Sequence, residues 1–131
     1  MKKSTLLSVI MSLCFVAFLN AQKIKIKKNT VYVDGQECLK VSGDSNNVSF
    51  SDLEGNEIFF LKFIHNSRYA SLYTKVTFFK EDLSFTSASY IFSKKLLIKK
   101  LLADGTLKDC NLVSEKVKRF VKKYDENVEM N

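Results

Sequence analysis

The sequence predicts an α+β fold, with an antiparallel β-meander of about six to seven strands followed by two C-terminal helices packed on the sheet. Up to residue 90, short segments alternate apolar and polar residues with a period of two and are separated by turn residues. From Ser93 onward the apolar residues recur at helical spacing instead. The chain has no proline and only four glycines, and no linker divides it. We therefore expect a single domain over 22–131.

The first 21 residues match the pattern of a secretory signal peptide. Two lysines precede a mostly apolar run over 6–19, and Ala21 supplies the small residue expected at a cleavage position. The run is short for a transmembrane anchor, which needs about 20 apolar residues. A lipoprotein acylated at Cys14 is another alternative, but the bulky Leu13 stands where such signals carry a small residue. We expect cleavage after Ala21.

The end of this segment, Asn20-Ala21-Gln22, and the lysine-rich region after it resemble many small exported proteins of Gram-negative bacteria. The resemblance covers only the first two dozen residues. It implies a location in the periplasm or outside the cell, and no activity. No motif in the remaining residues points to a specific family.

The net charge bears on the kind of partner. Removal of 1–21 takes two of the 21 basic residues, which leaves 19 against 14 acidic residues and a net charge of +5. Export makes nucleic acid an unsuitable partner, whereas an envelope protein, a glycan or weak contact with an anionic membrane surface fits the compartment. A surface that is charged only for solubility is the competing interpretation.

Four short strands joined by turns are expected in the N-terminal half of the domain. Residues 22–28 alternate lysine with isoleucine, which predicts a half-buried strand whose lysines suit the edge of a sheet. Lys28-Asn29 predicts a tight turn, and Asp34-Gly35 is favoured in two-residue type I′ hairpins. The four strands are expected at 22–28, 30–33, 37–42 and 48–53.

The most apolar stretch, 58–79, predicts the central hairpin of the sheet around a polar break at 65–68. Its first arm is apolar on both faces, with Phe59, Leu61 and Phe63 on one face and Ile58, Phe60 and Ile64 on the other. A strand of this kind needs cover on both sides. We therefore expect the two helices to cover the second of these faces. A further strand is expected over 83–90.

Two helices follow the strands. Ser93 is a good N-cap for a helix that runs to Ala103, and Gly105 suits its C-terminal end. Ser114 is expected to cap the second helix in the same way. Lysines surround the leucine-rich stripe of the first helix, so a helix at a membrane interface is an alternative. A helix docked on the sheet is favoured because a face of the sheet needs cover.

The segments around the second helix carry little structural signal. A connector over 107–113 precedes this helix and contains Cys110. After the helix the chain becomes acidic and polar, and the tail over 126–131 is expected to fray.

Two cysteines, Cys38 and Cys110, remain after cleavage. An exported protein can hold them as a disulfide, which would contribute roughly 4 kcal/mol on the loop-entropy argument. Strict alternation places Cys38 opposite Leu39 and Val41, on the side where the helices are expected. Two separate buried thiols are the alternative.

The residues that usually perform catalysis are sparse and scattered. His65 is the only histidine and lies in the polar break of the central hairpin, so a Cys–His pair is not favoured over a solvent-exposed turn histidine. Asp44 and Asn46 have the spacing of calcium ligands, but the glutamate that completes a calcium loop is missing, so a turn is favoured. We expect no catalytic residue, no metal, no cofactor and no enzyme activity.

Aromatic residues are the more informative feature. The phenylalanines alternate with strand geometry and are expected in the core, although a cavity for an apolar ligand between sheet and helices is an alternative. Tyr69, Tyr73, Tyr90 and Phe60 are the candidate surface for a ligand or partner, because partly exposed aromatic side chains recur at binding surfaces.

These observations favour an exported, non-enzymatic binding or structural accessory protein of the bacterial cell envelope. It would act through an exposed sheet face or edge. The alternative is a small carrier that holds an apolar ligand between sheet and helices. The sequence contains no motif that names the partner.

Overall fold

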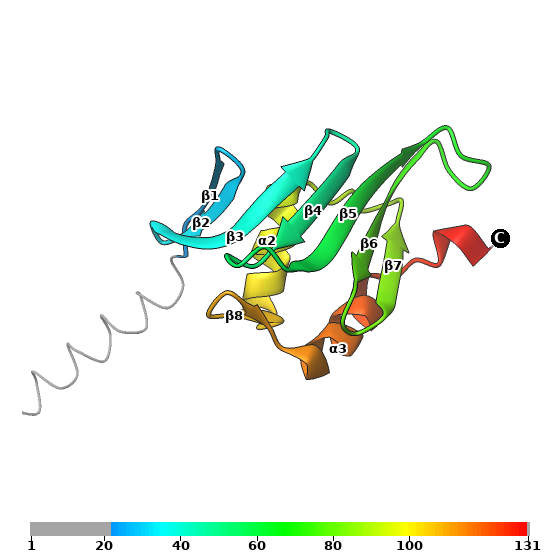
Figure 1. Cartoon of the computed structure of the whole chain (residues 1–131). Helices are drawn as coiled ribbons and strands as arrows, with labels where there is room; N and C mark the ends of the chain where they lie inside the picture. The colour runs from blue at the N-terminus through cyan, green and yellow to red at the C-terminus, as the bar shows by residue number, and fades with distance from the viewer. Residues whose placement is uncertain (1–21, 131) are drawn as a thin grey trace, which may run out of the picture.

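The computed structural model describes residues 22–130. Within them, a seven-stranded antiparallel sheet is followed by two helices (Figure 1). Each strand of the sheet pairs with the next one in the sequence, so the sheet is a continuous meander. This arrangement confirms the predicted α+β fold class. The expected signal peptide over 1–21 and the last residue, Asn131, lie outside the described residues.

The elements follow the expected order, with small differences in their bounds. The sheet consists of β1 (Ile24–Lys27), β2 (Thr30–Val33), β3 (Gln36–Gly43), β4 (Asn47–Ser51), β5 (Glu57–His65), β6 (Leu72–Phe78) and β7 (Leu83–Ser87). The helices are α2 (Lys94–Ala103) and α3 (Ser114–Tyr124). A small hairpin of β8 (Leu107–Lys108) and β9 (Asn111–Leu112) forms in the expected connector. A 3-10 helix, η1 (Val128–Met130), ends the described chain.

The two N-terminal hairpins turn where the sequence predicts it. Lys28 and Asn29 have φ angles of 50° and 63°, and Asp34 and Gly35 have φ angles of 51° and 82°. Two consecutive residues with positive φ are typical of a type I′ turn, whose twist matches that of the flanking strands. Both predicted turns are therefore confirmed.

A β-bulge changes the direction of Cys38. Val31 of β2 pairs with Leu39, but the next residue, Tyr32, pairs with Glu37, so Cys38 is the extra residue of the bulge. Cys38 and Leu39 consequently both lie in the core, where they are 2% and 0% exposed. The expectation that Cys38 would face away from Leu39 and Val41 was wrong, because strict alternation fails at a bulge.

The helices cover the face of the sheet opposite to the one expected. Phe59 and Leu61 of β5 are fully buried in the core that the sheet shares with the helices. Ile58, Phe60 and Ile64 are only partly buried. The expectation that these three residues would lie under the helices was therefore wrong.

The neighbours of β5 explain this choice of face. Strand register places Phe59 between Phe50 of β4 and Phe78 of β6, and the rings of Phe50 and Phe59 stack with centroids 4.6 Å apart. On the other face, Phe60 lies between a serine of β4 and a threonine of β6. The covered face is thus apolar across several strands, so docking of the helices there buries more apolar area.

The helices pack on this face through their apolar stripes. α2 has its main contacts within the sheet with β1, and α3 has its main contacts with β7. The helical residues buried in the shared core are Leu97, Ile98, Leu101, Val117 and Phe120. This confirms that α2 docks on the sheet and leaves its leucine-rich stripe unavailable to a membrane surface. None of the helices within residues 22–130 is long and apolar enough to span a membrane.

The serine N-cap predicted from the sequence is present at α2 but absent at α3. The Ser93 hydroxyl accepts a hydrogen bond from the backbone N–H of Leu96 at 3.1 Å, which confirms the predicted cap. Gly105 follows the end of α2 with a φ of 72°. Ser114, in contrast, is the first helical residue of α3 and does not cap it. Its hydroxyl donates to the Glu81 carboxylate at 2.7 Å, a contact that binds α3 to the β6–β7 turn.

The C-terminal tail is bound along β7. The backbone N–H of Glu126 donates to the Thr86 carbonyl, and the backbone N–H of Val128 donates to the Thr86 hydroxyl, both at 2.8 Å. Glu129 accepts hydrogen bonds from the Tyr73 hydroxyl at 2.7 Å and the Lys75 ammonium at 2.9 Å. Figure 1 shows η1 beside the β6–β7 side of the sheet. The expectation of fraying was therefore wrong for 126–130, because polar side chains that look solvated in sequence here satisfy the edge of the sheet.

The attachment of the tail predicts a dependence of stability on acid. Burial raises the pKa of Glu126, but hydrogen bonds from Ser87, Ala88 and Ser89 outweigh it and lower this pKa from 4.5 to about 2. Because the pKa of Glu126 is lower in the folded than in the unfolded state, its ionised carboxylate stabilises the fold at pH values above about 4.5. This contribution is lost as the pH falls from about 4.5 to about 2. Because the carboxylate is largely exposed, we expect Glu126→Gln to cost about 1 kcal/mol at pH 7 and little at pH 2.

Urea unfolding of the wild-type protein and the Glu126→Gln variant between pH 2 and pH 7 measures this effect. Glu54→Gln is the matched control, since Glu54 is exposed in the turn after β4. A difference between wild type and Glu126→Gln that stays constant across this pH range would show that the carboxylate does not hold the tail.

Candidate functional site

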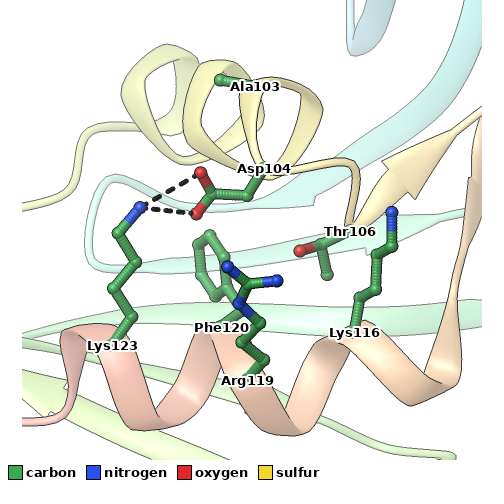
Figure 2. Close-up of a pocket in the computed structure, with 7 residues that line it drawn as sticks. All are labelled: Ala103, Asp104, Thr106, Lys116, Arg119, Phe120 and Lys123. Carbon is green, nitrogen blue, oxygen red and sulfur yellow. Dashed lines mark hydrogen bonds and ion pairs between the residues drawn. The ribbon is translucent and has the colours of Figure 1, made fainter.

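A basic pocket lies between the C-terminal end of α2 and the exposed side of α3. It has a volume of about 320 Å³. Figure 2 shows Lys116, Arg119 and Lys123 rising from α3 toward the turn that follows α2. The residues that line the pocket are Ala103, Asp104, Thr106, Lys116, Arg119, Phe120 and Lys123.

The helical repeat of α3 brings its three cationic residues together. Lys116, Arg119 and Lys123 are separated by three and four residues, so they share one side of the helix. Phe120 on the adjacent stripe anchors α3, because its ring packs edge-on against Phe78 and Phe85 at centroid distances of 6.2 and 5.7 Å. The core therefore sets the rotation of α3 and directs the three cations toward α2.

Asp104 is the only carboxylate in the lining, and it is already paired. Its two oxygens lie 3.2 and 3.3 Å from the Lys123 ammonium. The hydrogen bond to Asp104 is the main reason why the pKa of Lys123 is raised. The position also suits Lys123, because a cation beside the C-terminal end of α2 interacts favourably with the helix dipole.

Lys116 and Arg119 have no such partner. Within residues 22–130 the ion pairs join Lys123 to Asp104 and Lys75 to Glu129, and no carboxylate lies within 4.0 Å of either Lys116 or Arg119. With three cations and one carboxylate, the charges of the lining sum to +3 − 1 = +2. The pocket is therefore a local concentration of positive charge.

The turn after α2 makes room for one of these cations. A Cβ atom placed on Gly105 would lie only 2.9 Å from the Lys116 Nζ, and the positive φ of Gly105 also disfavours a side chain. The next residue, Thr106, is 1% exposed, and Figure 2 shows its hydroxyl oxygen directed toward the pocket. Gly105 thus leaves room for the Lys116 ammonium, and Thr106 places its hydroxyl on the same rim of the pocket.

These groups define what the pocket can bind. Ammonium, guanidinium and hydroxyl groups donate hydrogen bonds, and the one carboxylate acceptor is occupied by Lys123. Such a set suits an anionic group, because charge-assisted hydrogen bonds to carboxylate or phosphate are the strongest that it can form.

Comparison with protein-family models, with curated proteins and with solved structures found no match to this chain. Function is therefore inferred from the geometry of the site. Among the described residues, the pocket between α2 and α3 has the most specific chemistry, and it forms the basis of the functional proposal.

The four residues predicted as a ligand or partner surface do not come together. Tyr73 is 2% exposed, and its hydroxyl is bound to the tail through Glu129. Phe60 lies partly buried on the uncovered face of the sheet. Tyr69 lies in the loop between β5 and β6, where its hydroxyl accepts a hydrogen bond from Arg68 at 2.7 Å.

Tyr90 lies apart from the other three, beside the helices. Its ring packs against Phe92 and Tyr124 at centroid distances of 4.9 and 6.0 Å. The Lys100 ammonium lies 5.8 Å from the same ring. Tyr90 is 36% exposed, so it belongs to the edge of the aromatic core.

The phenylalanines between sheet and helices contact one another. Phe85 packs against Phe78, Phe92 and Phe120, with ring centroids 5.6 to 6.5 Å apart. All four rings are 0 to 1% exposed. This packing is the core arrangement expected from the sequence. The alternative of a carrier for an apolar ligand stays a prediction.

The predicted disulfide is confirmed. Cys38 and Cys110 are bonded, with their Cα atoms 5.2 Å apart. The bond joins the bulge of β3 to the turn between β8 and β9, where Asp109 and Cys110 have φ angles of 50° and 63°. It therefore holds the small hairpin that begins just after Thr106, at the rim of the basic pocket.

The residues considered for catalysis or metal binding make other contacts in the structure. The His65 Nε2 is 3.0 Å from the Asn46 side-chain oxygen, and both cysteines are in the disulfide. Asp44 accepts hydrogen bonds from the backbone N–H groups of Asn46 and Asn47, which also lower its pKa. In the part of the chain that the structure describes, no group of three or more His, Cys, Asp or Glu residues is placed to hold a metal ion.

Sequence reasoning missed the basic pocket. Lysines at 116, 118, 122 and 123 surround the apolar stripe of the second helix, so Lys116 and Lys123 do not stand out in the sequence from a solvated surface. The signal that was available is the spacing of Lys116, Arg119 and Lys123 beside the core residue Phe120. That spacing alone does not show that α2 ends opposite these residues.

Proposed function

We propose that this protein is an exported, non-enzymatic binding protein of the bacterial cell envelope that holds an anionic group of its partner in the pocket between α2 and α3. One observation carries the proposal: Lys116 and Arg119 line a pocket of about 320 Å³ in which the only carboxylate is paired with Lys123. Lysine and arginine side chains without a carboxylate partner can form charge-assisted hydrogen bonds with an anion.

The compartment agrees with this function. A disulfide persists in oxidising surroundings such as the periplasm or the cell exterior, and the Cys38–Cys110 bond supports export there. The signal-like pattern over 1–21 supports the same location. Anionic glycans and anionic groups of envelope proteins are available in that compartment, and the basic charge of residues 22–131 favours encounter with them.

A charge-matched pair of double variants tests the proposal. Lys116→Ala with Arg119→Ala removes two cations from the pocket, whereas Lys118→Ala with Lys122→Ala removes two exposed lysines of α3 that do not line it. We expect the pocket variant to bind purified Gram-negative envelopes at least about ten-fold more weakly, since each charge-assisted hydrogen bond contributes roughly 1.5–3 kcal/mol. The control variant should lose less than about three-fold, because exposed charges contribute little.

The measurement is cosedimentation of the protein, produced by export to a bacterial periplasm, with the envelopes over a range of protein concentrations. Equal losses in the two double variants would show that binding depends on net charge alone. Absence of binding by the wild-type protein would also contradict the proposal.

A further inference from the structure

We infer that the group bound in this pocket is a phosphate monoester. The inference rests on the proposed function, because it names the ligand class for the same site. Three properties of the lining support it: its charge, its hydrogen-bond donors and the fixed position of the helix that carries its cations. Nothing in the sequence alone distinguishes a phosphate from any other anion.

The charge of the lining matches a dianion. Lys116, Arg119 and Lys123 contribute +3 and Asp104 contributes −1, which leaves +2. A phosphate monoester carries a charge of roughly −1.5 to −2 near neutral pH, whereas a carboxylate or a phosphodiester carries about −1. A monoester therefore neutralises the charge of the lining, whereas a monoanion leaves a net charge of about +1.

The hydrogen-bonding groups of the lining favour an oxygen-rich anion. Lys116, Arg119 and Thr106 supply donors from both sides of the pocket, while both oxygens of Asp104 face the Lys123 ammonium. The three terminal oxygens of a phosphate monoester accept hydrogen bonds, and a guanidinium can bind two of them together. A neutral sugar would place several hydroxyl donors in a pocket without a free carboxylate to accept from them.

The helix that carries the cations is fixed before a ligand arrives, and Lys123 is already paired. Gly105 leaves space for the Lys116 ammonium at the turn after α2, and Phe120 fixes the helix that carries Arg119. The pair between Asp104 and Lys123 neutralises the one carboxylate that would repel an anion. A helix that is already fixed loses less conformational entropy on binding, which favours affinity.

The pocket has room for more than the phosphate itself. Its volume of about 320 Å³ lies at the lower end of the range of roughly 300–1,000 Å³ that is usual for small-molecule sites. It therefore suits a phosphate together with part of the group that carries it. In an envelope, that carrier is either a phosphorylated glycan or a lipid headgroup, and both present the same monoester chemistry.

Calorimetric titration with three matched sugars tests the ligand class. Glucose 1-phosphate carries the monoester, glucuronate carries a carboxylate and glucose is neutral. We expect glucose 1-phosphate to bind at least about ten-fold more tightly than glucuronate, and glucose to give no heat of binding. Arg119→Ala should weaken binding of glucose 1-phosphate at least about ten-fold, whereas Lys118→Ala with Lys122→Ala should change it by less than about two-fold.

Vesicles distinguish the two sources of the phosphate. Phosphatidylcholine vesicles with phosphatidic acid present a monoester, and those with phosphatidylglycerol present a diester. Stronger binding to phosphatidic acid than to glucose 1-phosphate indicates a lipid headgroup, and the reverse order indicates a glycan. Equal binding to both vesicle types, unaffected by Arg119→Ala, would overturn the inference in favour of a general attraction to charge.

The outcomes separate this inference from the proposed function. If glucuronate binds as tightly as glucose 1-phosphate, the phosphate assignment is wrong and the anion-binding function stands. The phosphate assignment is also wrong, and the anion-binding function still stands, if binding to envelopes depends on Lys116 and Arg119 but neither glucose 1-phosphate nor phosphatidic acid vesicles bind. If binding to envelopes does not depend on these two residues, the proposed function itself is wrong.

Discussion

Replacement of both Cys38 and Cys110 by alanine is expected to lower the free energy of unfolding by about 4 kcal/mol. The bond joins residues that are 72 positions apart in the sequence. Loss of the bond lets the unfolded chain explore many more conformations, and the entropic effect grows with the size of the closed loop. This is a large change for a domain whose total stability is on the order of 5–15 kcal/mol.

The position of the bond adds to this effect. β8 and β9 have two residues each, and a two-stranded hairpin of this size is not stable by itself. The disulfide attaches its turn to the buried bulge of β3. We therefore expect the hairpin to be the first segment that loosens when the bond is broken.

Urea unfolding of three samples measures the contribution of the bond: the oxidised wild type, the wild type in reducing agent, and Cys38→Ala with Cys110→Ala. The reduced wild type and the double variant are expected to unfold at the same urea concentration. A double variant within about 0.5 kcal/mol of the oxidised protein would mean that the bond does not constrain the fold. A non-reducing digest without a linked Cys38–Cys110 peptide would contradict the bond itself.

Replacement of Phe85 by alanine is expected to cost about 3–5 kcal/mol. Phe85 lies at the centre of the aromatic core, where its ring packs against those of Phe78, Phe92, Phe120 and Tyr124. These neighbours come from β6, from the segment before α2 and from α3. Truncation leaves a cavity that they cannot fill together, because each is held by a different element.

Phe79→Ala is the matched control for this experiment. Phe79 is the same residue type in the turn after β6, and it is 44% exposed. Its truncation is expected to change the free energy of unfolding by less than about 1 kcal/mol, as exposed positions usually do. Thermal or urea unfolding of both variants provides the comparison. Equal effects at Phe79 and Phe85 would show that the rings do not form the core described here.

Local sequence signals determined the succession of elements. The turn residues Asp34 and Gly35 specify positive φ, and Ser93 specifies the start of α2, because each acts on backbone groups within a few residues. The change from a period of two to a period of 3.6 likewise depends only on neighbouring residues. The meander, its order and the two helices were therefore predictable from the chain alone.

Only the tertiary structure decided which face of the sheet is covered and where Cys38 points. Both depend on register: the bulge opposite Val31 and Tyr32 adds a residue to β3, and the pairing of Phe59 with Phe50 joins apolar positions that are separate in sequence. A period of two within one strand contains no information about its neighbours. One face of β5 looked as suitable as the other until the strands beside it were known.

The tail and the pocket were decided in the same way. Glu126 and Glu129 look solvated in sequence, yet they bind β7, β6 and the loop that follows β7. Lys116 and Arg119 look like surface residues of an amphipathic helix, and they line a pocket only because α2 ends opposite them. Polar contacts over such distances depend on the packing of elements, so a sequence determines their residue types while the fold determines their partners.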